Sequence, residues 1–185
     1  MYSTSDFKRG LRILFKGEPY QIMEFEHHKP GKGAAIVRTR LRNLLTGITT
    51  APTFRSGDKV EVPDLHDRDV QYLYASDDIY HFMDPQSYEQ FEVPSKTLGN
   101  SALYLTEGIT VSLLFYQERA INIELPKQVV LQIAECDPAV RGNTVTGASK
   151  PAKLQTGLKT QVPLFVNEGD SIKIDTKNGE YIERA

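Results

Sequence analysis

Apolar and polar residues alternate over short stretches of the chain, and these stretches end at Gly, Pro, Asn or Asp. In the stretch GLRILFKGEPYQIMEFE, for example, Leu11, Ile13 and Phe15 occupy every second position. A period of two residues is typical of a β-strand with one buried face. The stretch therefore predicts two strands that are joined by a turn at residues 16–19.

The same kind of pattern continues to the end of the chain. Further strands are predicted within residues 46–54, 58–64, 128–138 and 160–176. Three hairpins are predicted, with turns at Asp77 and Asp78, at residues 117–119, and at Asn178 and Gly179. Helix is scarce, and residues 95–105 suggest one short helix.

Many short strands with turn residues between them indicate an all-β protein. Residues 1–64, 65–126 and 127–185 each contain four or five candidate strands, which is enough for one small barrel apiece. The sequence therefore predicts three tandem small β-barrels with these boundaries. One larger sandwich is the competing interpretation.

Residues 34–47, AAIVRTRLRNLLTG, fit either a helix or a strand. A helix would have an apolar stripe made of Ala34, Val37, Leu41, Leu44 and Leu45. A strand would place Arg38, Arg40 and Arg42 on one face, opposite Val37, Thr39 and Leu41. The flanking glycines and the β-rich surroundings favour the strand. Its arginine row then fits a solvated face and a track for phosphate groups about equally well.

The net charge of −2 conceals an uneven distribution along the chain. Residues 1–64 have 11 Lys and Arg against 7 Asp and Glu, residues 65–126 have 3 against 10, and residues 127–185 have 8 against 7. A nucleic acid would therefore be attracted to the first third and repelled by the second. The single cysteine, Cys136, and the lack of a membrane-spanning or signal-like apolar run favour a cytoplasmic protein that binds no membrane.

Residues 29–33, KPGKG, form a small basic loop. Pro30 and Gly31 fit the second and third positions of a type II β-turn, in which glycine supplies the positive φ. Lys32 would then stand on a narrow tip, because Gly31 and Gly33 add no bulk beside it. A narrow tip of this kind fits a slot, although a solvated hairpin turn is the commoner meaning of such a sequence.

Several kinds of chemistry are disfavoured by the residues present. A phosphate-binding loop would need glycine where Glu26 stands and Ser or Thr where Gly33 stands. Adjacent His27 and His28 would point to opposite faces of a strand, so they make a poor metal site. No catalytic triad motif is visible, although a triad is assembled in space and a sequence does not exclude one. The negative charge of the middle third favours core packing over base stacking for its aromatic residues, such as Tyr72, Tyr74, Tyr80 and Phe82.

The motif KPGKG, followed by AIVRTRLRNLLTG and by KPAKLQTGLKTQVPLFVNEGDSIKIDTKNGEYIER, resembles the bacterial elongation factor P family. The resemblance runs from about Phe7 to Arg184. The residues that match the C-terminal signature of the family are Lys150, Ala152, Gly157, Val162, Pro163, Gly169 and Asp170. The resemblance implies a KOW-like (SH3-like) N-terminal barrel followed by two OB-fold barrels in an elongated, L-like arrangement.

The resemblance also implies a function, which is that of a factor that is not an enzyme and needs no metal or cofactor. A family member is expected to bind the 70S ribosome as a monomer between the P and E sites and to position the P-site peptidyl-tRNA for peptide-bond formation at consecutive prolines. Lys32 occupies the position that the family modifies, and a lysine there suggests β-lysylation by a lysyl-tRNA-synthetase-like enzyme. Its supporting loop is Lys29, Pro30, Gly31 and Gly33, and the row Arg38, Arg40 and Arg42 would contact tRNA or rRNA backbone.

A second family loop falls at Gly142, Asn143 and Thr144. The family has Gly-Asp-Thr here, facing the mRNA codon in the E site, so Asn143 removes a carboxylate from that contact. The alternative from a different functional class is a stand-alone OB-fold protein that binds RNA without the ribosome.

Overall fold

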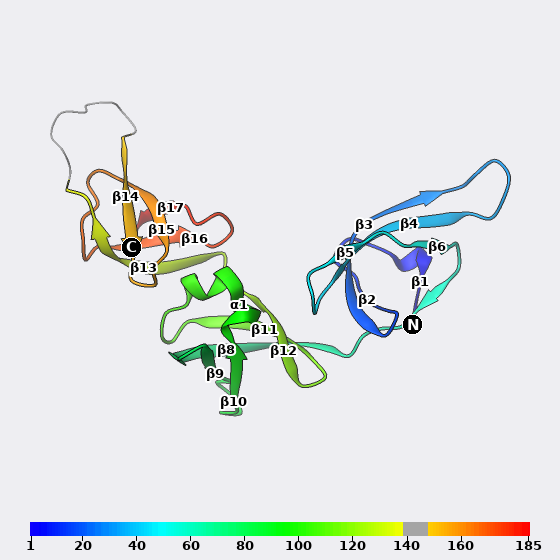
Figure 1. The fold of residues 1–185 in the computed structure, drawn as a ribbon, viewed down its shortest axis with the longest axis horizontal. Coiled ribbons are helices and arrows are strands. Elements are labelled where there is room, and N and C mark those ends of the chain that lie inside the picture. Colours follow the sequence, from blue (N-terminus) through cyan, green and yellow to red (C-terminus); the bar gives the residue numbers. More distant parts are fainter. Residues whose placement is uncertain (139–147) are drawn as a thin grey trace. The chain divides into compact units, whose positions relative to one another are not determined.

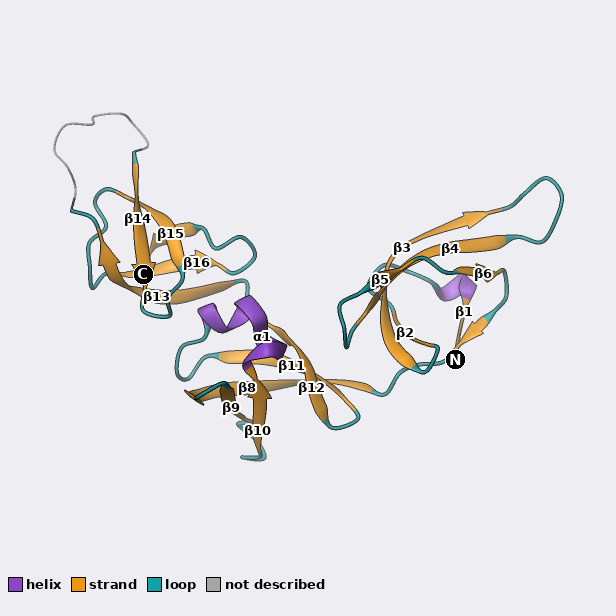
Figure 2. Ribbon diagram, in the orientation of Figure 1, coloured by secondary structure: helices purple, strands orange, loops and turns teal. Residues whose placement is uncertain are grey.

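The computed structural model describes residues 1–138 and 148–185, and most regular structure in them is β-strand (Figures 1 and 2). Within these residues, the strands form three five-stranded sheets and one two-stranded pair. The predicted all-β class is thus confirmed. Within the described residues, no helix has both the length and the apolar character needed to cross a membrane.

The first sheet is formed by the N-terminal part of the chain. Its strands, in spatial order, are β2 (Arg12–Phe15), β3 (Glu18–His28), β4 (Ile36–Asn43) and β5 (Thr49–Thr50), with β6 (Thr53–Arg55) paired to β4. The two-stranded pair consists of β1 (Tyr2–Ser3) and β7 (Lys59–Val60), and a 3-10 turn, η1 (Thr4–Asp6), follows β1. These elements enclose a core of Phe7, Ile13, Ile22, Val37, Leu41, Phe54 and Val60.

The segment that fitted both helix and strand forms strand β4. Its burial alternates along its whole length, with Val37, Thr39, Leu41 and Asn43 buried. Each arginine between them is therefore exposed, as the strand interpretation predicted.

The second sheet is formed by the middle of the chain. Its strands, in spatial order, are β10 (Gln90–Pro94), β9 (Ile79–Met83), β8 (Leu65–Ser76), β11 (Thr110–Tyr116) and β12 (Arg119–Glu124). The single short helix predicted for residues 95–105 is two consecutive turns instead, α1 (Ser95–Leu98) and the 3-10 helix η2 (Gly99–Tyr104). The α-helix ends at Leu98 because Gly99 has a φ of 53°, which the interior of an α-helix does not allow.

The aromatic residues of the second sheet are only partly in its core. Tyr72 and Phe82 are buried, with ring centroids 5.5 Å apart, and Tyr80 is half-buried. Tyr74 is 55% exposed and stacks on His81 at 4.4 Å, so core packing was the wrong expectation for this residue. A bulge in β8 between Tyr72 and Tyr74 shifts the register there.

The third sheet is formed by the C-terminal part of the chain. Its strands, in spatial order, are β15 (Lys159–Pro163), β14 (Ser149–Leu154), β13 (Gln128–Cys136), β16 (Ser171–Asp175) and β17 (Tyr181–Arg184). Their inward residues form a second apolar core, made of Val129, Leu131, Ile133, Ala152, Leu154, Val162, Val166, Ile172 and Ile174.

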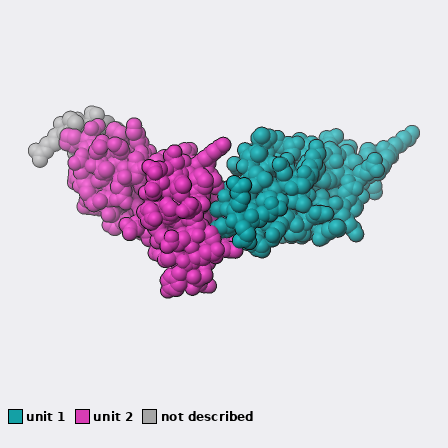
Figure 3. Space-filling view, turned by 60° about the horizontal axis from the view of Figure 1, so that its bottom comes forward, with its two compact units in different colours: residues 1–66, 115–121 teal, residues 67–114, 122–185 magenta. Residues whose placement is uncertain are grey.

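The chain divides into two compact units, drawn in different colours in Figure 3. One comprises residues 1–66 and 115–121, and the other comprises residues 67–114 and 122–185. The predicted domain boundaries at residues 64 and 126 stay a prediction.

Within the second unit, helix η2 packs against the C-terminal core. Tyr104 contacts this core from outside, and the Thr156 hydroxyl donates a hydrogen bond to the carbonyl of Leu103. The Thr176 hydroxyl likewise donates to the carbonyl of Pro126, at 2.6 Å. Apolar contact and hydrogen bonds thus join the middle and C-terminal sheets.

Candidate functional site

Strands β3 and β4 form a long hairpin in the first sheet (Figure 1). The paired residues run from Tyr20 opposite Asn43 to His28 opposite Ile36, with one bulge between Ile22 and Glu24. Residues 29–35, which include the KPGKG motif, form the loop beyond the last pair. In the space-filling view, unit 1 narrows to a thin tip (Figure 3).

The base of this loop is braced by a third strand. Strand β6 pairs with β4 from Ile36 to Arg38, and the amide of Ser56 donates a 2.8 Å hydrogen bond to the carbonyl of Ala35. The hairpin is therefore held from both sides of β4 up to Ala35. Only residues 29–34 extend beyond this support.

The predicted type II turn at the tip is wrong. Gly33, and not Gly31, has the positive φ, at 119°. A Cβ on Gly33 would lie 3.7 Å from Cγ of Pro30, which is ordinary contact, so backbone conformation rather than space requires glycine there. The turn rule failed because the strand pairing sets a loop of seven residues, longer than a four-residue turn.

Lys32 lies exposed at this tip. Its side chain makes no hydrogen bond or ion pair with any residue in the described part of the chain. Nothing lies within 4 Å of the position that a Cβ on Gly31 would take, and neither glycine has a side chain that crowds the lysine. The ammonium group is thus available for an external partner, and Lys29 and Pro30 complete the loop that carries it.

The arginine row lies on the exposed face of the same hairpin, but it is not purely cationic. In the pairing of β3 with β4, Glu26 is opposite Arg38 and Glu24 is opposite Arg40. Arg40 and Glu24 approach to 4.0 Å, and both side chains are 59% exposed. The sequence reasoning missed these two glutamates, although their alternation in MEFEHH matches that of the arginines.

This exposed ion pair does not prevent Arg40 from binding elsewhere. A solvent-exposed pair contributes only about 0.2–1 kcal/mol, which a phosphate contact can replace. The carboxylates remain on the same face, however, and repel an approaching polyanion. The two glutamates therefore reduce the positive electrostatic potential of the arginine row.

The second predicted loop, Gly142, Asn143 and Thr144, lies outside the described residues. The described residues on either side of it are joined. Lys150 is only 5% exposed, and its Nζ donates a 2.8 Å hydrogen bond to the carbonyl of Asp137. No group of three metal-ligating side chains occurs among residues 1–138 and 148–185.

Three family descriptions match successive parts of the chain. Residues 3–60 match "Elongation factor P (EF-P) KOW-like domain", residues 65–123 match "Elongation factor P (EF-P) OB domain", and residues 129–184 match "Elongation factor P, C-terminal". Together they cover all three sheets.

Whole proteins give the same result. Elongation factor P of Bdellovibrio bacteriovorus is 48% identical over 184 residues, covering 100% of this chain and 98% of that protein. Elongation factor P of Desulfovibrio desulfuricans is 50% identical, covering 100% of both. Among solved structures, eukaryotic translation initiation factor 5A from Methanococcus jannaschii aligns with a TM-score of 0.54 and 25% identity, over 68% of this chain and 92% of that one.

Proposed function

The chain belongs to the elongation factor P family, and from this membership we propose that it binds the 70S ribosome between the P and E sites. There it contacts the P-site peptidyl-tRNA and stimulates peptide-bond formation at consecutive prolines. The coarser statement, that it is a translation elongation factor, follows from the relatives alone. Its site of action in the cytoplasm is part of the proposal.

The observation that supports this proposal most directly is the position of Lys32. Its ammonium group is exposed, has no partner in the described part of the chain, and is carried by a hairpin that is braced up to Ala35. A stiff, narrow support holds a cation in one place at low entropic cost. Such a tip suits a narrow cleft between RNA strands.

The proposed mechanism is positional. Proline has a fixed φ and a constrained nitrogen nucleophile, so consecutive prolines hold the peptidyl-tRNA in an unproductive geometry. Contacts from Arg38, Arg40 and Arg42 to RNA backbone, with Lys32 near the CCA end, restore alignment and lower the entropic part of the barrier. The factor transfers no proton and acts as an accessory to the catalysis of the ribosome.

The modification of Lys32 is part of the same proposal. We infer β-lysylation by a lysyl-tRNA-synthetase-like enzyme, which would lengthen the side chain and add an amine. The exposed amine of Lys32 is accessible to such an enzyme. Peptide mass spectrometry of protein from its native host tests this directly, with added mass expected on the peptide that contains Lys32. An unmodified lysine would reject the inference.

The functional role is tested with Lys32→Ala and the matched variant Lys29→Ala, each of which removes one charge from the loop. We expect Lys32→Ala to abolish rescue of a triple-proline reporter while thermal unfolding is unchanged, because the side chain has no packing role. Lys29→Ala should retain most of the rescue. Full rescue by Lys32→Ala would reject the proposal, and equal loss in both variants would assign the effect to loop charge.

A further inference from the structure

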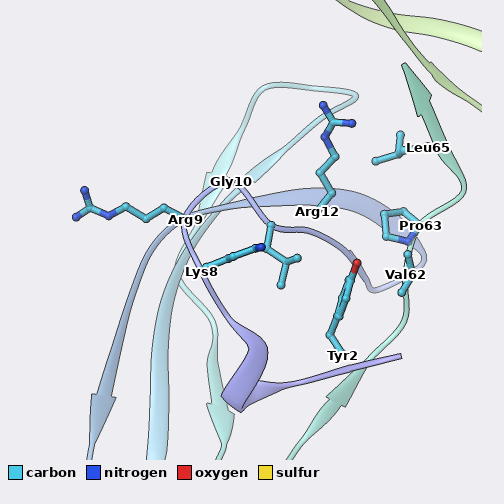
Figure 4. A pocket seen from close by; sticks show the side chains of 9 residues that line it. Tyr2, Lys8, Arg9, Gly10, Arg12, Val62, Pro63 and Leu65 are labelled. Atoms are coloured by element: carbon cyan, nitrogen blue, oxygen red, sulfur yellow. The ribbon is translucent and has the colours of Figure 1, made fainter. Parts of the chain in front are cut away.

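A surface pocket of unit 1 has basic residues in its lining, but they do not converge on one point (Figure 4). Lys8 extends toward the pocket, whereas Arg9 and Arg12 point away from it. A single ammonium group beside Tyr2 and Val62 does not define an anion site. The reactive group that the structure does define lies in the other unit, at the turn between β16 and β17.

This turn contains the pair Asn178 and Gly179, which the sequence predicted as a hairpin signal. Among the asparagines of the chain, only Asn178 is followed by glycine. The backbone nitrogen that follows an asparagine can attack its side-chain amide, and glycine hinders this approach least because it has no side chain. Asn178 is exposed, so water reaches it. The pair is therefore a candidate for chemical modification as well as a turn.

The reaction at such a pair is deamidation. The backbone nitrogen of Gly179 loses its proton to hydroxide and bonds to Cγ of Asn178, the bond from Cγ to Nδ2 breaks, and Nδ2 takes a proton from water and leaves as ammonia. The product is a five-membered succinimide ring. Water opens this ring at either carbonyl and leaves aspartate or isoaspartate at position 178. One water is consumed and one ammonia is released, with no oxidation or reduction.

In the folded turn, the attacking nitrogen is held in place. The amide of Gly179 donates a 2.8 Å hydrogen bond to the carbonyl of Asp175. The carbonyl of Gly179 in turn accepts a 2.8 Å hydrogen bond from the hydroxyl of Thr160. Removal of the amide proton would break the first of these bonds. The nitrogen is therefore a poor nucleophile until the turn opens.

The side-chain amide of Asn178 is held as well. Its Oδ1 accepts a 3.0 Å hydrogen bond from the amide of Glu180, and its Nδ2 donates a 2.7 Å hydrogen bond to Oε2 of Glu180. Rotation of the amide requires both bonds to break. The two reacting groups are thus fixed separately, and opening of the turn releases both.

Strand β17 controls this opening. It lies at one end of its sheet and pairs with β16. Nη2 of Arg184 is 2.8 Å from Oδ1 of Asp170, an ion pair that fixes the far end of the strand. Strands at the end of a sheet open at a lower free energy than strands in its centre, so the turn is exposed to local opening.

We propose that Asn178 is a site of spontaneous deamidation and that the folded β16–β17 turn confines the reaction to the open state. Both products disturb the turn. Aspartate places a second carboxylate beside Oε2 of Glu180, and isoaspartate adds one carbon to the backbone path. An opening that leads to reaction is therefore irreversible, and modified chains accumulate with age. The inference rests on the turn alone and is independent of the proposed function.

The first test compares the full chain in native buffer with the full chain in guanidinium chloride, at the same pH and temperature. Peptide mass spectrometry follows the loss of the amide, and chromatography separates isoaspartate from aspartate. We expect the unfolded chain to react at least about tenfold faster and to give both products at position 178. Equal rates would overturn protection by the fold. No reaction in the unfolded chain would overturn the site, and aspartate alone would overturn the ring intermediate.

The second test compares Arg184→Gln with Lys153→Gln. Each removes a cation from an ion pair in the same sheet, but Lys153 pairs with Glu135 and leaves β17 untouched. Arg184→Gln should speed deamidation of the folded chain several-fold, and Lys153→Gln should change it less than about twofold. Equal acceleration by both variants would overturn control by β17.

The third test examines the effect of one product on the fold. Asn178→Asp should lower the midpoint of thermal unfolding, because two carboxylates then lie side by side. Adding Glu180→Gln should recover the loss, because the introduced amide can donate to the new carboxylate. An unchanged midpoint for Asn178→Asp would overturn the expected damage to the turn.

Discussion

Gly179 is a residue whose missing side chain has two structural reasons. Its φ is 75°, a left-handed conformation that costs other residues about 1 kcal/mol or more. A Cβ at this position would also lie 3.0 Å from the hydroxyl oxygen of Tyr104, on the helix that packs against the C-terminal core. The glycine thus permits both the β16–β17 turn and the contact with η2.

We predict that Gly179→Ala lowers the free energy of unfolding by about 1–2 kcal/mol, as measured by urea denaturation followed by circular dichroism. Introducing Tyr104→Phe beside it removes the crowding hydroxyl and should recover part of the loss. Gly17→Ala is the control for backbone conformation alone, because its φ is 82° and nothing lies within 4 Å of its Cβ position. Unchanged stability of Gly179→Ala would contradict this account.

The residue types predicted an exposed lysine between small neighbours, but they did not predict the backbone conformation of the loop. Small neighbours and an exposed lysine follow from the residue types, and the structure has both. The turn type was wrong because the loop ends are set by the pairing of His28 with Ile36 and by the bond of Ser56 to Ala35. Both contacts lie outside the four residues that a β-turn rule considers.

At the scale of elements, the alternation of apolar and polar residues predicted most strands. It did not decide between helix and strand where the apolar positions fitted both periods. In residues 34–47 the apolar positions satisfied both the helical and the strand period, and only the partners β3, β5 and β6 decide for the strand. Alternation places Glu24 and Glu26 on one face of a strand, but it does not place them opposite the arginines. Their register depends on a bulge between Ile22 and Glu24 that no sequence pattern marks.

This register leads to a prediction for the β3–β4 face. Replacing Arg38, Arg40 and Arg42 with Gln should weaken ribosome association and flatten its salt dependence, because up to three phosphate contacts are lost. Replacing Glu24 and Glu26 with Gln should act in the opposite direction, because it removes the opposing carboxylates. Binding measured across a series of salt concentrations tests both. Unchanged binding of the arginine variant would make the row an ordinary solvated face.

At the scale of the whole molecule, charge is divided among the three thirds of the chain. The excess of cations in residues 1–64 and of carboxylates in residues 65–126 gives a net charge of only −2. Such a chain discriminates between partners by which face they approach, whereas a uniformly basic protein binds any polyanion.

We therefore predict that neutralising exposed acidic residues in the middle third reduces selectivity. The variant Asp77→Asn, Glu92→Gln, Glu124→Gln should bind naked RNA more tightly than the natural sequence does, with smaller gains for ribosomes. Filter binding to unstructured RNA and to 70S particles compares the two. Were the natural sequence to bind naked RNA as tightly as ribosomes, it would act as a stand-alone RNA-binding protein instead.

The brace that β6 provides has a consequence for protein engineering. Folding free energy resides in the core and in the ladder below Ala35, so the chemistry of the tip is decoupled from thermostability. From Ala35 to Lys32 the backbone spans three residues, which is roughly 10 Å at full extension. The side chain of Lys32 adds its own length to the reach of the amine. A photoreactive crosslinker installed at position 32 would therefore report on its surroundings without a stability penalty to the barrel that carries it.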